Sequence, residues 1–213
     1  MKENETLIKI KPRANGVVLE GALVSCSAEH GMVIAPPHPL YGGSMSSPVV
    51  QQLVKASRRQ NISSIRFEWR GIGGSSGTPS GASGDADLDY GAALDLISEA
   101  VNGAIIASGY SFGSLAAHRA AANPRVVGLI LVAPPAEYFD QDALTRLEKP
   151  VLLVAGEYDR VAPAEELSLL CDKEGFVQLK IIKGADHFFG QGLREIGTGA
   201  YNWLVDFFKN EAR

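Results

Sequence analysis

The sequence predicts a doubly wound α/β fold, in which helices cover both faces of a mostly parallel sheet. Apolar segments alternate with amphipathic segments along nearly the whole chain. Short apolar runs such as Val126-Val-Gly-Leu-Ile-Leu-Val and Val151-Leu-Leu-Val lack polar alternation, as strands do when helices cover both sheet faces. The chain has 213 residues, which suits one domain of this class, so we expect a single domain over residues 1–213.

The strands and helices are expected in a regular order. The first strand alternates apolar and polar residues and the second follows a Gly turn, which favours an antiparallel hairpin. From Gly31 onward strands and helices alternate, which predicts parallel strands. The predicted strands are residues 6–11, 17–26, 31–36, 62–69, 103–109, 126–133, 151–156 and 177–182. The predicted helices are residues 46–59, 85–99, 112–123, 162–172 and 194–210.

Local composition supports several of these elements. The run Lys55-Ala-Ser-Arg-Arg is typical of the solvated end of a helix, and helix 112–123 is rich in alanine. Segment 71–84 is rich in Gly and Ser and is predicted to be a long loop. In the last helix, large apolar residues recur at helical spacing and are expected to dock on the sheet. These residues are Trp203, Leu204, Phe207 and Phe208.

Composition argues against several classes of protein. The net charge is −4 and no long Lys/Arg block occurs, which argues against a nucleic-acid-binding surface. The first 16 residues are too charged for a signal peptide, and no apolar run reaches the ~18 residues of a membrane span. We therefore expect a cytoplasmic protein. The sequence does not indicate its oligomeric state.

Cysteine and histidine spacing gives no sign of a metal site. Cys26 and Cys171 lie far apart without a CxxC motif, and although their number allows a disulfide, we expect two buried thiols. The four histidines form no HExxH motif and no i, i+4 pair. We expect neither a metal nor another cofactor.

Gly-x-Ser-x-Gly occurs twice, centred on Ser75 and on Ser111. A nucleophilic serine needs an exposed oxygen beside backbone N–H donors, which a sharp strand-to-helix turn with flanking small residues provides. Ser111 has this setting, because the apolar strand 103–109 precedes it and the Ala-rich helix 112–123 follows. After Ser75 comes GTPSGASGD, with no helix former for a full turn. We therefore predict that Ser111 is the nucleophile and Ser75 a loop serine.

A nucleophilic serine also needs a base to take its proton and an acid to orient that base. Asp159 and His187 lie just past the carboxyl ends of two successive apolar strands, where ligands bind in such sheets. Glu157 and Asp186 compete with Asp159 as the acid, but Asp186 adjoins the histidine and is poorly placed to orient its ring. We predict Asp159 as the acid and His187 as the base.

An oxyanion hole usually takes one N–H from the residue after the nucleophile, here Phe112, and a second from the loop after an early strand. The loop PHPLYGGSM follows the predicted strand 31–36 and ends before a helix. We expect Leu40 to be the second donor, with Tyr41 as the alternative. A rigid loop without a part in the reaction is the other interpretation of this segment.

Five motifs together make the chain resemble the α/β-hydrolase superfamily. They are PHPLYGGSM, FEWRGIGGSSG, GYSFGS, GEYD and ADHFF, and they occur in this order within residues 31–208. Within the superfamily the chain is similar to a small bacterial group related to the dienelactone-hydrolase-like esterases, although its nucleophile would be Ser rather than their typical Cys. The resemblance implies an eight-stranded, mostly parallel sheet, the Ser111–Asp159–His187 triad and ester hydrolysis. It also implies that Arg70 and the 71–77 turn brace the sheet edge.

The segment before the predicted acid is too short for a helical cap domain. Residues 134–150 suffice for one short helix, so the expected fold has no cap and an open site. Its expected boundary is aromatic, formed by Tyr41, Phe112, Tyr138, Phe139 and Phe188. Short-acyl or exposed esters suit such a site better than long triglycerides do. Glycines in GIGGSSG do not open a helix directly, so a dinucleotide site is not supported.

The hypothesis from sequence is a serine esterase acting on a small-molecule ester through an acyl-enzyme. A thioesterase, an amidase or a peptidase could use the same three residues, because the triad does not choose the leaving group. A binding protein that keeps the fold without turnover is the alternative outside enzymes.

Overall fold

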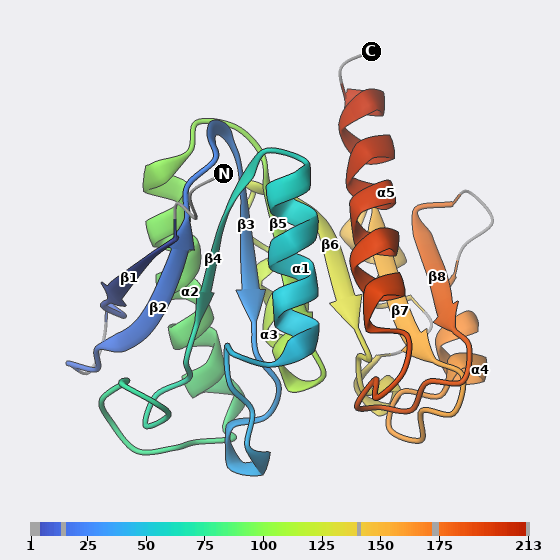
Figure 1. The fold of residues 1–213 in the computed structure, drawn as a ribbon, viewed down its shortest axis with the longest axis horizontal. Helices are drawn as coiled ribbons and strands as arrows, with labels where there is room; N and C mark the ends of the chain where they lie inside the picture. The colour runs from blue at the N-terminus through green and yellow to red at the C-terminus, as the bar shows by residue number, and fades with distance from the viewer. Residues whose placement is uncertain (1–4, 14–15, 140–141, 172–174, 212–213) are drawn as a thin grey trace.

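The computed structural model describes residues 5–13, 16–139, 142–171 and 175–211, and its centre is one eight-stranded sheet (Figure 1). The strand order is β1-β2-β4-β3-β5-β6-β7-β8. β1 and β2 form the antiparallel hairpin that the sequence predicts, β2 pairs antiparallel with β4, and all later pairs are parallel. The strands are β1 (Glu5–Ile10), β2 (Leu19–Val24), β3 (Ser27–Ala35), β4 (Ile62–Phe67), β5 (Ile105–Tyr110), β6 (Val126–Val132), β7 (Val151–Gly156) and β8 (Val177–Ile182). The predicted α/β class with a mostly parallel eight-stranded sheet is confirmed.

Helices cover both faces of this sheet. α1 (Pro48–Arg59) packs against α5 (Leu193–Glu211) on one face, and α2 (Ser83–Ala100) packs against α3 (Phe112–Ala120) on the other (Figure 1). The short α4 (Ala164–Ser168) contacts β7 and β8. Because both faces are covered, every residue of β4, β5 and β7 is buried, which explains their lack of polar alternation.

The loops that follow the parallel strands gather at one edge of the sheet, the lower edge in Figure 1, which we call the carboxyl edge. The loop after β3 contains the 3₁₀ turn η1 (Pro39–Tyr41). Between β6 and β7 lie two further single turns, η2 (Ala136–Tyr138) and η3 (Thr145–Leu147), where the sequence predicts one short helix. Residues 140–141 are outside the described part, and the described residues of 134–150 form no helical cap.

Several predicted boundaries are wrong by a few residues. α3 ends at Ala120 rather than 123, since Asn123 precedes a proline and this position disfavours helical backbone. α4 spans Ala164–Ser168 rather than 162–172, and residue 172 lies outside the described residues. β4 ends at Phe67, so Glu68, the first residue beyond it, already belongs to the following loop.

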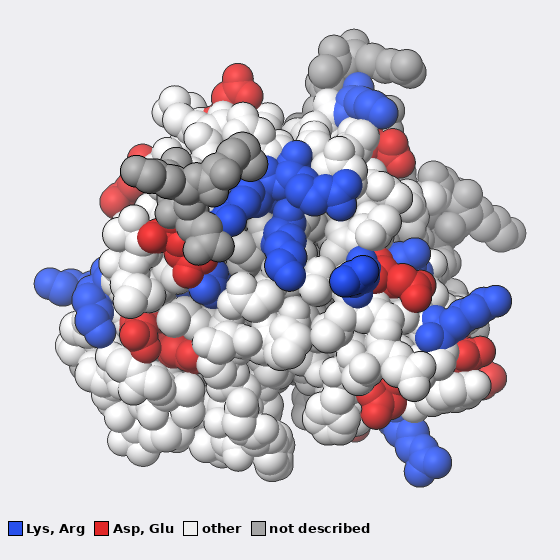
Figure 2. Space-filling model, in the orientation of Figure 1, with Lys and Arg blue, Asp and Glu red and all other residues white. Residues whose placement is uncertain are grey.

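The predicted burial of the two cysteines is also wrong. Cys26 is exposed in the turn between β2 and β3, and Cys171 is partly buried; neither forms a disulfide. Among the described helices, none is long and apolar enough to cross a lipid bilayer. Charged side chains of both signs are interspersed on the face seen in Figure 2.

Candidate active site

Ser111 occupies the sharp turn between β5 and α3 at the carboxyl edge. Its backbone lies at φ 53° and ψ −119°, a strained conformation for a residue with a side chain. The flanking glycines allow this turn to close: a Cβ on Gly109 would lie 2.2 Å from the Gly113 carbonyl oxygen, and a Cβ on Gly113 would lie 2.5 Å from that of Pro36. The Ser111 residue is partly exposed, so its hydroxyl is on an accessible turn.

The Ser111 hydroxyl, the His187 imidazole and the Asp159 carboxylate form one continuous series of hydrogen bonds. Ser111 Oγ lies 3.0 Å from His187 Nε2. On the other side of the ring, His187 Nδ1 lies 2.8 Å from Asp159 Oδ2 and 3.0 Å from Oδ1. The loops after β7 and β8 supply these two residues, because neighbouring parallel strands end at the same edge.

The Asp159 carboxylate is buried, yet it remains in its charged form. Burial alone would raise its pKa, but hydrogen bonds from His187 and from the backbone N–H groups of Ala162 and Val161 outweigh burial and hold the pKa below its ordinary value. Both N–H groups donate to Asp159 Oδ1 at 2.8 Å. The site therefore presents an ionised acid to the imidazole, which favours a proton on Nδ1 and a free lone pair on Nε2.

The competing residues have other contacts. Ser75 is buried in the loop after β4, where its hydroxyl donates to the Glu68 carbonyl and accepts the Glu20 N–H. Glu157 and Asp186 are exposed, and their carboxylates accept backbone N–H groups, of Gly184 and of Phe188. The prediction that Ser75 is a loop serine is confirmed.

The two predicted oxyanion donors lie on segments that are in contact. Phe112 is the first residue of α3, so its N–H has no partner within the helix. The phenyl ring of Phe112 lies 4.5 Å from the imidazole of His38, between ring centroids. His38 also caps η1, because its Nδ1 accepts the Leu40 N–H at 3.2 Å, while the Tyr41 N–H donates to the His38 carbonyl. A bound oxyanion would therefore share the Leu40 N–H with His38 or displace it.

The predicted aromatic boundary residues differ in their surroundings. Tyr41, Tyr138 and Phe188 are highly exposed, at 87%, 65% and 78% of their surface. Phe139 is partly buried, and its ring lies 5.0 Å from that of His118 on α3. In the parts of the chain that the structure describes, no three His, Cys, Asp or Glu side chains gather to hold a metal ion.

Sequence reasoning missed one residue of this site, Tyr110, which immediately precedes Ser111. Its hydroxyl donates to the backbone carbonyl of His187 at 2.8 Å. Burial, together with the nearby carboxylates of Asp159 and Asp186, raises the pKa of this phenol well above its ordinary value, so it remains a donor. The position before the serine in a Gly-x-Ser-x-Gly motif can hold any residue, so it carries no signal for such a contact.

Comparison with known proteins identifies relatives along almost the whole chain. The sequence profile of the alpha/beta hydrolase domain matches residues 41–203. A protein of unknown function from Agrobacterium tumefaciens superposes with a TM-score of 0.84 at 24% identity, covering 97% of this chain and 98% of that one. An alpha-beta serine hydrolase homologue from Coxiella burnetii gives 0.78 at 28% identity, covering 96% and 98%. An α/β serine hydrolase without a lid, from Xanthomonas campestris, gives 0.81 at 22% identity, covering 97% and 96%.

Proposed function

This chain belongs to the alpha/beta hydrolase family, and from that premise we propose that it is a serine esterase that cleaves small carboxylic esters through an acyl-enzyme. Ser111 is the nucleophile, His187 the base and Asp159 the acid that orients the base. The observation that supports this most directly is the continuous series Ser111 Oγ–His187 Nε2, at 3.0 Å, and His187 Nδ1–Asp159 Oδ2, at 2.8 Å.

In the first half-reaction, His187 Nε2 takes the proton of the Ser111 hydroxyl as this oxygen attacks the acyl carbon. The N–H groups of Phe112 and Leu40 stabilise the oxyanion, and His187 then protonates the leaving alcohol. In the second half-reaction, His187 activates the water that releases the acid. Asp159 stabilises the imidazolium in both steps, because its carboxylate is ionised and buried against Nδ1.

The surroundings favour a small, uncharged ester. The described part of the segment before β7 forms two single 3₁₀ turns rather than a cap that would enclose a long acyl chain. Over the loops that follow β3 and β4, at the lower left of Figure 2, the surface is mostly uncharged. The exposed residues Tyr41, Tyr138 and Phe188 offer apolar contacts to a short acyl or alcohol group.

Turnover of p-nitrophenyl acetate and butyrate tests the nucleophile. We expect Ser111→Ala to lose roughly 10⁴-fold or more in kcat, since removing the nucleophile removes the acyl-enzyme route. The matched control is Ser75→Ala, at the other Gly-x-Ser-x-Gly serine, which should unfold at lower urea and lose far less turnover than Ser111→Ala. Equal turnover by native protein and Ser111→Ala would overturn the assignment.

Covalent labelling by a fluorophosphonate separates an enzyme from a binding protein with the same fold. Native protein should be labelled at Ser111, and His187→Ala should abolish labelling because the hydroxyl then lacks its base. Labelling that persists in His187→Ala, or is absent from native protein, contradicts the mechanism. Running a thioester and an anilide beside the ester compares leaving groups on the same three residues.

A further inference from the structure

The loop between β3 and α1, residues 36–47, carries the proposed donor Leu40, and two consecutive residues after β4 hold it in place. β3 and β4 are parallel neighbours, with Ile34 opposite Arg66. Continuing the two chains past this pair brings the start of the β3–α1 loop beside Glu68 and Trp69. Both side chains are buried.

Trp69 holds the start of the β3–α1 loop and also contacts α3. Its indole Nε1 donates to the carbonyl oxygens of Pro36, at 3.2 Å, and Pro37, at 2.9 Å. The indole ring meets the Phe112 ring edge-on, with centroids 5.5 Å apart. One buried side chain, 1% exposed, therefore touches the residue that supplies one proposed donor and the segment that leads to the other.

Glu68 holds the far end of the same loop. Its carboxylate accepts the Ser44 hydroxyl at 2.6 Å and the Met45 N–H at 3.0 Å. Burial raises the pKa of Glu68 above its ordinary value, with a smaller effect in the same direction from the nearby Glu20 carboxylate, although these two donors favour the charged form. The β3–α1 loop is thus tied to residues 68–69 at both ends, by four hydrogen bonds to two adjacent side chains.

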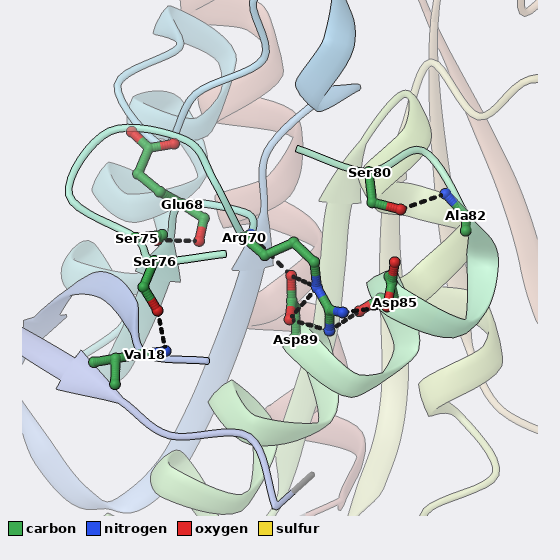
Figure 3. Close-up of polar contacts among 9 residues, drawn as sticks. All are labelled: Val18, Glu68, Arg70, Ser75, Ser76, Ser80, Ala82, Asp85 and Asp89. Atoms are coloured by element: carbon green, nitrogen blue, oxygen red, sulfur yellow. Dashed lines mark hydrogen bonds and ion pairs between the residues drawn. The ribbon is translucent and has the colours of Figure 1, made fainter. Parts of the chain in front are cut away.

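Residues 68–70 are themselves anchored, so they can serve as a fixed reference. Figure 3 shows the Glu68 carbonyl accepting the Ser75 hydroxyl, and the Arg70 guanidinium bound to Asp89 and Asp85 of α2. The Arg70 backbone N–H also donates to Asp89 Oδ2 at 2.9 Å. These contacts fix the backbone from which the Glu68 and Trp69 side chains extend.

We propose that Trp69, supported by Glu68, is a positioning residue that sets the spacing between the Phe112 and Leu40 N–H groups of the oxyanion hole. This inference rests on the proposed function. An oxyanion hole works because its donors are already aimed at the developing charge, and a misplacement of about 1 Å can cost about 10²-fold in rate. Loss of the indole N–H should therefore weaken the transition state more than it weakens substrate binding.

The experiment compares the two tryptophans of the chain. Trp69→Phe removes the indole N–H next to the site; the control Trp203→Phe alters a residue of α5 that is 7% exposed and stacks on Phe207. We expect Trp69→Phe to lower kcat by about 10- to 100-fold with little change in KM. Its affinity for a trifluoromethyl ketone, whose adduct with Ser111 carries an oxyanion, should fall by the same factor. Trp203→Phe should change thermal stability and leave both quantities as in native protein.

A second pair of variants decides the outcome if Trp69→Phe does not fold. Glu68→Gln weakens the contacts to Ser44 and Met45. The control Glu20→Gln alters a carboxylate that binds the Gly74 N–H and acts on Glu68 only through its charge, without a contact to the β3–α1 loop. We expect Glu68→Gln to lower kcat and ketone affinity together, by less than Trp69→Phe, and Glu20→Gln to change neither. Folded variants at positions 68 and 69 with native kcat and ketone affinity would overturn the proposal. If instead native protein shows no Ser111-dependent turnover, the proposed function itself has failed.

Discussion

The orientation of the His187 ring depends on contacts at two ring atoms and at the backbone carbonyl of the same residue. Asp159 binds Nδ1, Ser111 meets Nε2, and the Tyr110 hydroxyl holds the backbone carbonyl of the same residue. Tyr110 and Ser111 are adjacent at the end of β5, so the strand that carries the hydroxyl also anchors the loop that carries the imidazole. The distance between the Ser111 hydroxyl and the His187 imidazole, the two groups proposed to react, is therefore fixed by a local link as well as by the sheet.

Tyr110→Phe should separate this link from general packing. Loss of the hydroxyl removes the hydrogen bond to the His187 carbonyl, so we expect stability to fall by about 1 kcal/mol and kcat to fall severalfold. Tyr90→Phe is the matched control: the Tyr90 hydroxyl is also buried, but it binds the Ser108 backbone. The control should lose stability and keep kcat. Equal effects of the two variants on kcat, measured beside urea unfolding, would contradict the positioning role.

Single residues were predictable from sequence where a pattern of neighbours defines them. Ser111 lies between an apolar strand and an Ala-rich helix, and Asp159 and His187 each follow an apolar strand, so strand ends sufficed to bring the three together. The contact of Tyr110 with His187 joins residues 77 positions apart and depends on how far a phenol reaches across the sheet edge. No local pattern encodes such a distance.

At the scale of elements, the turn between β5 and α3 is limited by backbone contact rather than by side-chain packing. Gly109 lies against the first turn of α3, and Gly113 lies against the carbonyls of Ala35 and Pro36 at the end of β3. The close approach brings α3 near the loop after β3. Both proposed donors depend on it, because one begins α3 and the other lies in that loop.

Gly113→Ala should therefore damage stability and turnover together. A Cβ 2.5 Å from a backbone oxygen forces backbone to move, at a cost of about 1–3 kcal/mol, and the shift separates the proposed donors. The matched control is Gly91→Ala in α2, where an added Cβ has open space and should stabilise the helix by about 0.5–1 kcal/mol. Urea unfolding and ester turnover measure both effects. A Gly113→Ala variant with native stability would show that the turn is looser than these contacts imply.

Most elements follow from the sequence because covered strands and amphipathic helices have distinct patterns. The exceptions have local causes. The helix predicted at 162–172 begins only at Ala164, because Ala162 precedes Pro163 and the position before a proline disfavours helical backbone. In the same way, α3 stops before the Asn123-Pro124 pair. The order of strands in the sheet, in which β4 lies between β2 and β3, also has no local sequence signal. It depends on which neighbouring strands bury each strand best.

At the scale of the whole molecule, the Asp159 site links stability to pH. The folded pKa of Asp159 lies below its ordinary value, so the ionised form stabilises the fold. This contribution is present above the ordinary pKa of about 3.9 and is lost as the pH falls through the folded value. Asp159→Asn removes the contribution, so its urea midpoint should fall less steeply than that of native protein as the pH drops below about 4. Parallel midpoint curves for the two proteins would contradict the depressed pKa.

Six exposed apolar side chains lie in loops on the same side of the molecule as the proposed chemistry. They come from separate loops at the carboxyl edge: Leu40 and Tyr41 after β3, Tyr138 after β6, Tyr158 and Val161 after β7, and Phe188 after β8. Beneath them, Ser111 and Asp159 are fixed by the sheet and by their backbone contacts.

This arrangement separates the exposed apolar side chains, which can vary, from the proposed catalytic residues, which cannot. The apolar side chains belong to four separate loops, so replacing one exposed side chain leaves the other three loops and the sheet that positions Ser111, Asp159 and His187 where they are. A directed library can therefore vary the exposed side chains one loop at a time while the proposed catalytic residues Ser111, Asp159 and His187 are kept.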